Sequence, residues 1–281
     1  MNRLDEIVRT MENIPPYPKV AQTVVVMLQD PNVSALELAK VIQFDQAITA
    51  NVLRLCNSAF FGLTRKVSSL EEALMVMGHG TLRDIVMASS SARFFKTDIK
   101  GYDLGQGELW LHAVATAIMA KQLVDYIPSV DAGLAFTTAL LHDIGKICLH
   151  TFVKDDFRAI MLKVIKEQSS FVAAEMEILG TNHAELGAKI LEKWEFDPQM
   201  VLAVRQHHEP DVLTKDNLSA LVALSNGLIV SMGIGVGVDG LALSLQGEGL
   251  NRFDITPQML DKCMAAMIDQ LESAKELFAL A

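Results

Sequence analysis

The apolar positions along this chain recur at intervals of three and four residues, which is the spacing of one face of an α-helix. Val20, Val24 and Met27 follow this spacing near the N-terminus. A sustained alternation of apolar and polar residues, rich in β-branched side chains, would predict strands, and the sequence has no such stretch. The pattern therefore predicts an all-α protein.

Polar residues that begin helices stand ahead of several of these periodic segments. Four such pairs combine a capping side chain with a glutamate three residues later or with a proline at the first helical position: Ser34 with Glu37, Ser69 with Glu72, Asp197 before Pro198, and Thr256 before Pro257. The last pair predicts a final helix over residues 257–280.

One segment in the middle of the chain breaks the helical pattern. Residues 94–107 combine charge, glycine and poor periodicity, which is typical of a connection between domains. We therefore expect two packed helical bundles, an N-terminal one over residues 1–96 and a C-terminal one over residues 107–281. Glycine is dense between Ser231 and Asp254, which predicts a long loop, and residues 236–252 within it are a candidate lid over a site.

Composition and charge narrow the class of protein. Apolar residues make up 51% of the chain and charged residues 21%, which is typical of folded cores. The formal net charge of −10 argues against a nucleic-acid binder, because such proteins present a basic face to phosphates. Cys56, Cys148 and Cys263 follow no spacing pattern, and we interpret them as reduced thiols of a cytoplasmic protein.

Neither a secretion signal nor a membrane span is expected. Asp5 and Glu6 lie where a signal peptide needs an apolar run. Residues 218–238 carry no charge and just reach the length of a membrane span, but serines, an asparagine and four glycines interrupt them. A buried core helix that runs into a glycine-rich loop is the better interpretation.

Six of the seven histidines lie in the C-terminal part of the chain. Five of these six lie within a predicted helix or at one of its ends. They fall in four separate segments: His112 within a periodic helix, His142 with Asp143 at a helix end, His183 at a helix start, and His207 with His208 before Pro210. Imidazole and carboxylate together suit iron or manganese, and also zinc. Adjacent residues at a helix end diverge by roughly 100°, so His142 and Asp143 can reach one metal from different sides or bridge two.

Each of these residues also has a simpler interpretation. His112 alone is typical of a core histidine, and His207 with His208 is typical of a solvated helix end.

Lys146 is a candidate for binding an anionic group beside the metals, or else it caps the carbonyl groups of the preceding helix. His79 and His150 lack companions and are interpreted as structural or surface residues. Four acidic loop residues have no positional argument for metal ligation: Asp131, Asp155, Asp156 and Asp211.

Several segments resemble known families. FTTALLHDIGK, which holds His142 and Asp143, resembles the defining segment of the HD superfamily of metal-dependent phosphohydrolases, and the order of the histidines is similar to the HD-GYP branch. IPPYPKV, VIQFDQAITANVLRLCNSAFFG and VSSLEEALMVMGHGTLRDIVM resemble the HDOD family, notably around residues 53–58. The resemblance covers roughly residues 10–230 and implies an HD-type fold for the C-terminal bundle.

The resemblance also implies a ligand set and points to departures from it. The implied metal ligands are His112, His142, Asp143, His183, His207, His208 and Asn226. Asn226 stands where HD enzymes place a final aspartate, and an amide oxygen binds transition metals more weakly than a carboxylate. The glycine-tyrosine-proline signature of cyclic di-GMP phosphodiesterases is absent after the histidine pair, where the chain reads HHEPDVLTKDN.

Three functions remain open at this point. The first is a bacterial signalling module, non-catalytic or weakly catalytic, that holds one or two divalent transition metals (iron or manganese ahead of zinc) and contacts a signalling protein. The second is a metal-dependent phosphohydrolase acting on a nucleotide or phosphodiester, in which Asp143 orients the attacking water and Lys146 neutralises the phosphate. The third is an interaction scaffold without metal.

Overall fold

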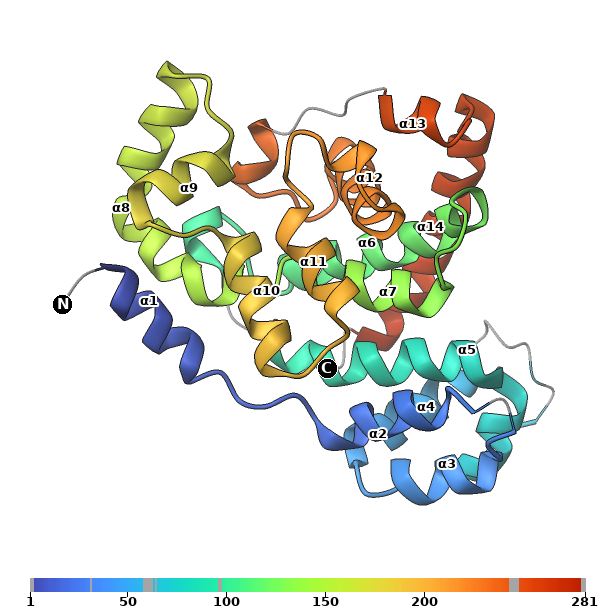
Figure 1. Cartoon of the computed structure of the whole chain (residues 1–281). Coiled ribbons are helices and arrows are strands. Elements are labelled where there is room, and N and C mark those ends of the chain that lie inside the picture. The colour runs from blue at the N-terminus through green and yellow to red at the C-terminus, as the bar shows by residue number, and fades with distance from the viewer. Residues whose placement is uncertain are drawn as a thin grey trace. The chain divides into compact units, whose positions relative to one another are not determined.

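The structure is a computed structural model, and it describes residues 3–30, 32–57, 63, 65–95, 98–242 and 248–278. These residues form helices joined by turns, and among them β-pairing is limited to one isolated bridge between Ile99 and Leu104. The predicted all-α fold is confirmed (Figure 1).

The chain divides into two compact units. The larger unit comprises Met1–Pro15 and Phe94–Asp269, and the smaller one comprises Pro16–Arg93 and Gln270–Ala281. The first helix, α1 (Arg3–Glu12), therefore belongs with the larger unit, and the last, α14 (Pro257–Phe278), is divided between the two. The division at residues 1–96 and 107–281 stays a prediction about separate folding domains.

The smaller unit is built on four helices: α2 (Lys19–Met27), α3 (Ala35–Ile42), α4 (Gln46–Cys56) and α5 (Leu70–Ser91). The capping box at the start of α3 forms as predicted, because the Glu37 amide donates to Ser34 Oγ and the Ser34 amide donates to Glu37 Oε2. Ser69 caps α5 by accepting from the Glu72 amide at 3.2 Å. Residues 58–62, which carry part of the HDOD-like segment, lie outside the described residues.

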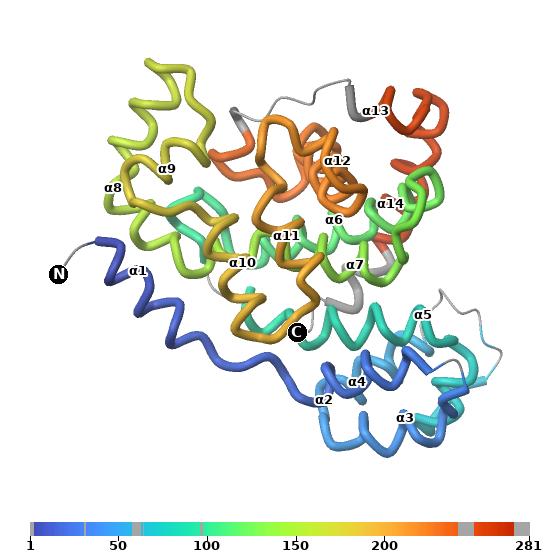
Figure 2. Tube along the Cα trace, in the orientation of Figure 1, coloured from blue at the N-terminus to red at the C-terminus, as the bar shows by residue number. Residues whose placement is uncertain are grey.

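The larger unit holds the remaining helices: α6 (Glu108–Leu123), α7 (Ala132–Leu141), α8 (Lys146–Lys166), α9 (Phe171–Leu179), α10 (His183–Lys193), α11 (Pro198–Gln206), α12 (Asn217–Ser231) and α13 (Glu248–Arg252). Helix α6 packs against both α7 and α12, α8 packs against α9, and α10 packs against α11 (Figure 2). Helix α12 is buried along most of its length. The prediction of a core helix in residues 218–238 is therefore confirmed for its first part.

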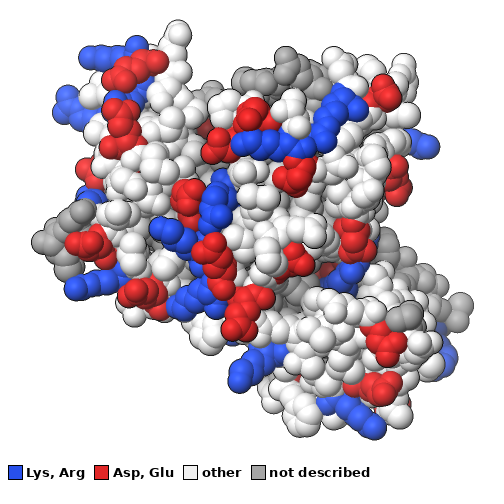
Figure 3. Space-filling view, in the orientation of Figure 1, with Lys and Arg blue, Asp and Glu red and all other residues white. Residues whose placement is uncertain are grey.

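Long apolar helices in this unit are core elements. One helical stretch, Ala132–Lys166, is long and apolar enough to cross a membrane by length and composition, but 83% of its apolar window is buried within the protein. On the face drawn in Figure 3, acidic and basic side chains of the larger unit are interspersed. A stretch that is mostly buried in this way packs in the interior of its own unit.

A close backbone approach fixes the junction between α7 and α8. A Cβ atom on Gly145 would lie 1.9 Å from the carbonyl oxygen of His183 and 2.7 Å from the amide nitrogen of Gly187. Only glycine permits this approach, so the turn after α7 is pressed against the start of α10. The packing brings two of the predicted histidine segments together.

Candidate metal centre

Asp143 lies at the centre of the histidine cluster. Helix α7 ends at Leu141, His142 follows as its C-terminal cap, and α8 begins at Lys146, so Asp143 stands in the short turn between two buried helices. Its side chain is 1% exposed. A buried carboxylate needs charged or hydrogen-bonding partners, and those partners define the site.

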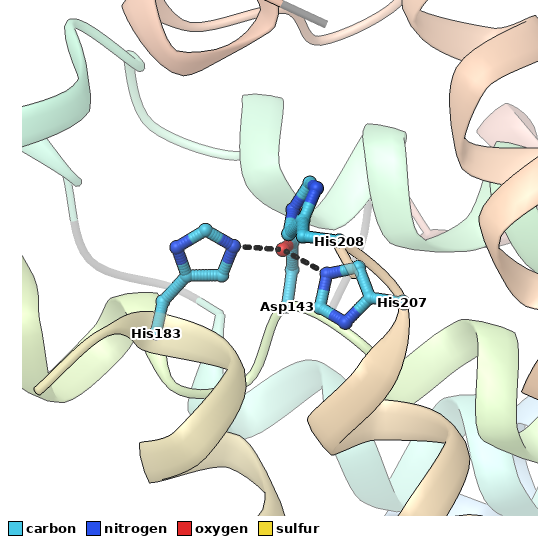
Figure 4. A group of neighbouring side chains, drawn as sticks. All are labelled: Asp143, His183, His207 and His208. Carbon is cyan, nitrogen blue, oxygen red and sulfur yellow. Dashed lines mark ion pairs between the residues drawn. The ribbon is translucent and has the colours of Figure 1, made fainter. Parts of the chain in front are cut away.

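Four helices bring histidines to this carboxylate. His112 comes from the first part of α6 and His142 from the end of α7. His183 is the first residue of α10, and His207 with His208 follows the end of α11 (Figure 4). The Nε2 atoms of His142 and His112 lie 3.4 and 3.6 Å from Asp143 Oδ2. Those of His183 and His207 lie 3.5 and 3.7 Å from Asp143 Oδ1. The predicted convergence of the segments is therefore present in the structure.

The ligand atoms form two groups that share Asp143. One group contains His112, His142 and Asp143, and the other contains Asp143, His183, His207 and His208; within each, the donor atoms lie within 4.8 Å of one another. Each oxygen of the carboxylate faces a different group. These residues would hold one or two ions, with Asp143 common to both groups and three or four protein ligands in each.

Backbone and carboxylate acceptors fix the orientation of the imidazole rings. The Nδ1 atoms of His142 and His207 each lie 2.6 Å from a carbonyl oxygen, on Ala139 and Val204 respectively, so both nitrogens carry the proton and donate. His183 Nδ1 lies 2.8 Å from Glu175 Oε2. Hydrogen bonds of this kind hold metal-ligating histidines in place and leave Nε2 with its lone pair toward the ion.

Several inward-facing atoms of the cluster lack hydrogen-bond partners. Among the described residues, the buried atoms without a partner include Asp143 Oδ1 and the Nε2 atoms of His142, His183, His207 and His208. Each such buried polar atom costs about 1–3 kcal/mol unless something satisfies it. A cation at the centre would satisfy all of them together, so the residues present fit a metal site.

Asn226 is paired with His112 in a way that also fits a cation. His112 Nδ1 donates to the carbonyl oxygen of Ile234 at 3.1 Å, so in a neutral ring Nε2 carries a lone pair. That nitrogen lies 3.0 Å from Asn226 Oδ1, which is also an acceptor. Two acceptor atoms this close would suit a cation that both of them bind. Without an ion, the pair is satisfied when the amide turns and donates from Nδ2.

Burial keeps most of the imidazoles neutral. It lowers the pKa of His112 and of His207 from 6.5 to about 4, and it lowers the pKa of His208 well below its ordinary value. Burial also opposes the charged form of His183, but the adjacent Glu175 carboxylate outweighs it and raises the pKa. Burial would raise the pKa of Asp143, yet His142 and Lys146 hold it well below its ordinary value. Neutral imidazole and ionised carboxylate are the forms that bind metal.

Lys146 lies beside the cluster and is bound to two carboxylates. Its ammonium donates to Asp143 Oδ2 and to Asp239 Oδ2, both at 2.6 Å, and the side chain is 5% exposed. Among its described hydrogen bonds there is none to the carbonyl groups at the end of α7, so the capping interpretation has no support. Its role in binding an anion stays a prediction.

Two residues of the site were not predicted from the sequence. Glu175, on α9, accepts from both the backbone amide and the Nδ1 atom of His183, and the hydroxyl of fully buried Tyr102 donates to its other oxygen. Asp239 follows the charge-free stretch 218–238 directly. The available signals were an acidic residue on the buried face of α9 and the first charge within the glycine-rich segment.

The remaining polar residues have other partners. His79 is exposed and His150 is partly exposed, and both lie outside the two ligand groups. Asp131 caps α7, Asp155 and Asp156 lie close to Arg3, and Asp211 pairs with Lys215. Of the candidate lid over residues 236–252, positions 243–247 lie outside the described residues.

The fold and the cluster together define an all-helical protein with a histidine–aspartate centre. A family model for the HDOD domain matches residues 14–210, and the chain belongs to this family. An uncharacterised protein of Treponema pallidum (strain Nichols) is 22% identical over 204 residues, which is 70% of this chain. The aligned part spans 38% of the length of that relative.

Solved structures share the fold. An HDOD domain protein of Geobacter sulfurreducens is 24% identical with a TM-score of 0.76, and 98% of each chain is covered. A Marinobacter aquaeolei protein, provisionally described as acting in signal transduction, is 20% identical with a TM-score of 0.73 and covers 99% of this chain and 65% of its own. A Shewanella amazonensis protein, provisionally described as a phosphohydrolase, is 21% identical with a TM-score of 0.71, covering 97% and 98%.

Proposed function

We propose that the chain is a regulatory HDOD module of a bacterial signalling system whose larger unit holds one or two divalent transition ions. The observation that carries this proposal is the ring of buried, partnerless ligand atoms around Asp143. The proposed ligands are His112, His142, Asp143, His183, His207, His208 and Asn226. Mixed imidazole and carboxylate donors with open positions favour iron or manganese over zinc.

The metal would link helices that are distant in the sequence. The ligands come from α6, the α7–α8 turn, α10, α11 and α12, so an ion would tie five parts of the larger unit together. Binding free energy of this kind adds to the stability of the folded state. A module whose rigidity depends on metal occupancy can report the metal, or a ligand on it, to a partner protein.

Regulation is favoured over hydrolysis by two features. Asn226 gives the centre one negative charge fewer than a carboxylate would, and the glycine-tyrosine-proline signature of cyclic di-GMP phosphodiesterases is absent after His208. The second candidate is a phosphohydrolase acting on a nucleotide or phosphodiester. In that case the bound metal would lower the pKa of a water molecule, Asp143 would orient the water, and Lys146 would neutralise the phosphate.

The cysteines and the exposed apolar side chains bear on location and partner. All three cysteines are buried and unpaired, which suits the reducing cytoplasm.

Large apolar side chains of the smaller unit are exposed, among them Phe44 at 80% and Met75 at 70%. We propose that this unit contacts a signalling protein, because a partner that covers exposed apolar side chains removes them from water and so stabilises the complex.

The test combines metal content with turnover. His142→Ala should purify with at least tenfold less metal than the parent, whereas the control His79→Ala should match it. The parent, loaded with iron or manganese, is then assayed against mono-, di- and cyclic nucleotides and a generic phosphodiester. A turnover that disappears in both His142→Ala and Asp143→Ala would make the phosphohydrolase the correct function. Absence of transition metal from the parent would leave the metal-free scaffold.

A further inference from the structure

A short glycine-rich segment carries Asp239 to the metal centre. We call residues 232–240 the glycine loop; it follows α12 directly and precedes the part of the chain that is not described. The side chain of Asp239 is 11% exposed, and its Oδ2 atom accepts from Lys146 Nζ at 2.6 Å. Its other oxygen, Oδ1, is buried and has no hydrogen-bond partner among the described residues. This carboxylate lies outside both proposed ligand groups.

The glycine loop is packed closely against the elements beside the site. A Cβ atom on Gly235 would lie 2.5 Å from the carbonyl oxygen of Glu108 and 2.9 Å from His112 Cβ. One on Gly237 would lie 2.4 Å from the carbonyl oxygen of Tyr102 and 2.8 Å from Asp239 Oδ1. The absence of side chains at these two positions therefore allows the loop to place Asp239 where it stands.

A cleft joins the loop to the metal centre. The cleft is narrow while Asp239 is in place, and it is partly open to solvent. From the centre it is lined by His112, Lys146, His208 and Asn226, and from the glycine loop by Asp239 and its neighbours. An anion bound in this cleft would meet the ammonium of Lys146 on the side where Asp239 now contacts it.

We propose that Asp239 occupies the place of an anionic group of the ligand, and that a phosphate-bearing ligand enters the cleft by displacing Asp239 from Lys146 and lifting the glycine loop. The proposal rests on the proposed function, because the same cleft contains the metal ligands. Lys146 has one proton left for a further acceptor, but a phosphate beside the buried Asp239 carboxylate would be repelled by it. Exchange of one anion for the other removes this repulsion.

The arrangement makes the apparent affinity for phosphate depend on the loop. If only a fraction of molecules have Asp239 released, the dissociation constant is raised by the inverse of that fraction. A substitution that releases the loop should therefore tighten binding even when it leaves every charge in place. This consequence separates displacement from a simple change in electrostatic potential.

The experiment measures binding of inorganic phosphate by calorimetry to the protein as purified, with its metal content determined on the same sample. Asp239→Asn removes the competing charge, and Gly237→Ala pushes the loop away without altering charge. Gly105→Ala is the control, because its Cβ would make only ordinary contact, 3.5 Å from Glu108 Oε2. We expect both loop variants to bind phosphate at least fivefold more tightly than the parent, and the control to stay within twofold.

Hydrogen exchange supplies a second readout. The Gly240 amide donates to the carbonyl oxygen of Gly237 at 3.1 Å, and its exchange in the parent should accelerate when phosphate is added. In Asp239→Asn the exchange should already be fast, and phosphate should add little. Circular dichroism checks that each variant is folded; if Gly237→Ala is not, Asp239→Asn and this amide decide the matter.

Each contrary result has a definite meaning. Tighter phosphate binding in Asp239→Asn alone, with Gly237→Ala folded and the hydrogen exchange of the Gly240 amide unchanged, would overturn the displacement. The loss of one negative charge would then explain the whole effect. Unchanged or weaker binding in both variants, or no phosphate binding in any of them, would also overturn it. If the purified protein contains no transition metal and both variants still bind phosphate more tightly than the parent, the metal centre is rejected and the displacement of Asp239 is retained.

Discussion

At the scale of single residues, the site depends on acceptors that lie behind the metal ligands. His142 and His207 donate from Nδ1 to carbonyl oxygens within their own helix ends, whereas His183 donates to a carboxylate on another helix. Glu175 also accepts from the His183 amide and from Tyr102, so its two oxygens are fully engaged. It is the side chain whose loss should affect the centre most without removing a ligand.

Replacement of Glu175 by glutamine tests this role. The amide keeps the size of the side chain but is a weaker acceptor than the carboxylate. It therefore orients His183 less firmly and raises the basicity of the His183 imidazole less. We expect metal affinity to fall by roughly 10- to 100-fold, as measured by competition with a chelator. Glu177→Gln on the same helix is the matched control, since Glu177 is exposed and pairs with Lys163. Equal affinity of the two variants would show that Glu175 does not act on the metal.

The residues that meet at Asp143 could be named from the sequence, but their supports could not. Each histidine segment has a local sign, such as the end of an apolar helix at His142 or a proline after His208. Glu175 and Asp239 have only weak local signs, and neither sign names a partner, because His183 and Lys146 are brought to them by tertiary packing. Local sequence patterns predict where helices end. Contacts between residues distant in the sequence can be identified only once the fold is known.

At the scale of helices, the start of α8 against the start of α10 is the contact that holds the centre together. The predicted caps form where they were expected, as at Ser34 and at Asp197, which accepts from the Gln199 amide. Capping is encoded within a few residues and is therefore readable from the sequence. The approach at Gly145 involves the distant His183 and Gly187, and no local pattern indicates it.

Gly145→Ala tests the importance of this approach. The added methyl group would meet backbone atoms that cannot turn away, so the two helices must separate. We expect the free energy of unfolding in urea to fall by about 2–3 kcal/mol, with a loss of bound metal. Gly105→Ala, at an exposed position with ordinary contacts, should change it by less than about 0.5 kcal/mol. A Gly145 variant as stable as this control would contradict the packing described.

At the scale of the whole molecule, the larger unit buries a set of neutral imidazoles that metal and pH should both affect. The folded-state pKa of His112 and of His207 is about 4, and that of His208 is also lowered, against 6.5 for an ordinary histidine. Below pH 6.5 the unfolded chain therefore binds protons that the folded chain does not. Stability contributed by these groups is lost as the pH falls from 6.5 toward 4. His183 has the opposite sign, because its folded-state pKa is raised.

The three lowered groups outnumber the raised one, which sets the expected pH dependence. For metal-free protein we expect the thermal unfolding midpoint to be lower at pH 5 than at pH 7 by at least about 5 °C. His207→Gln should reduce this difference, and His79→Gln, at an exposed position outside the cluster, should leave it unchanged. A midpoint that rises on acidification would mean that these imidazoles are not held neutral by burial.

The most direct test of the account is the transition-metal content of the chain purified without chelator, determined by elemental analysis. The two ligand groups that share Asp143 predict one to two equivalents of iron, manganese or zinc per chain. Less than a tenth of an equivalent of any transition metal would contradict the claim that these imidazoles and this carboxylate form a metal centre.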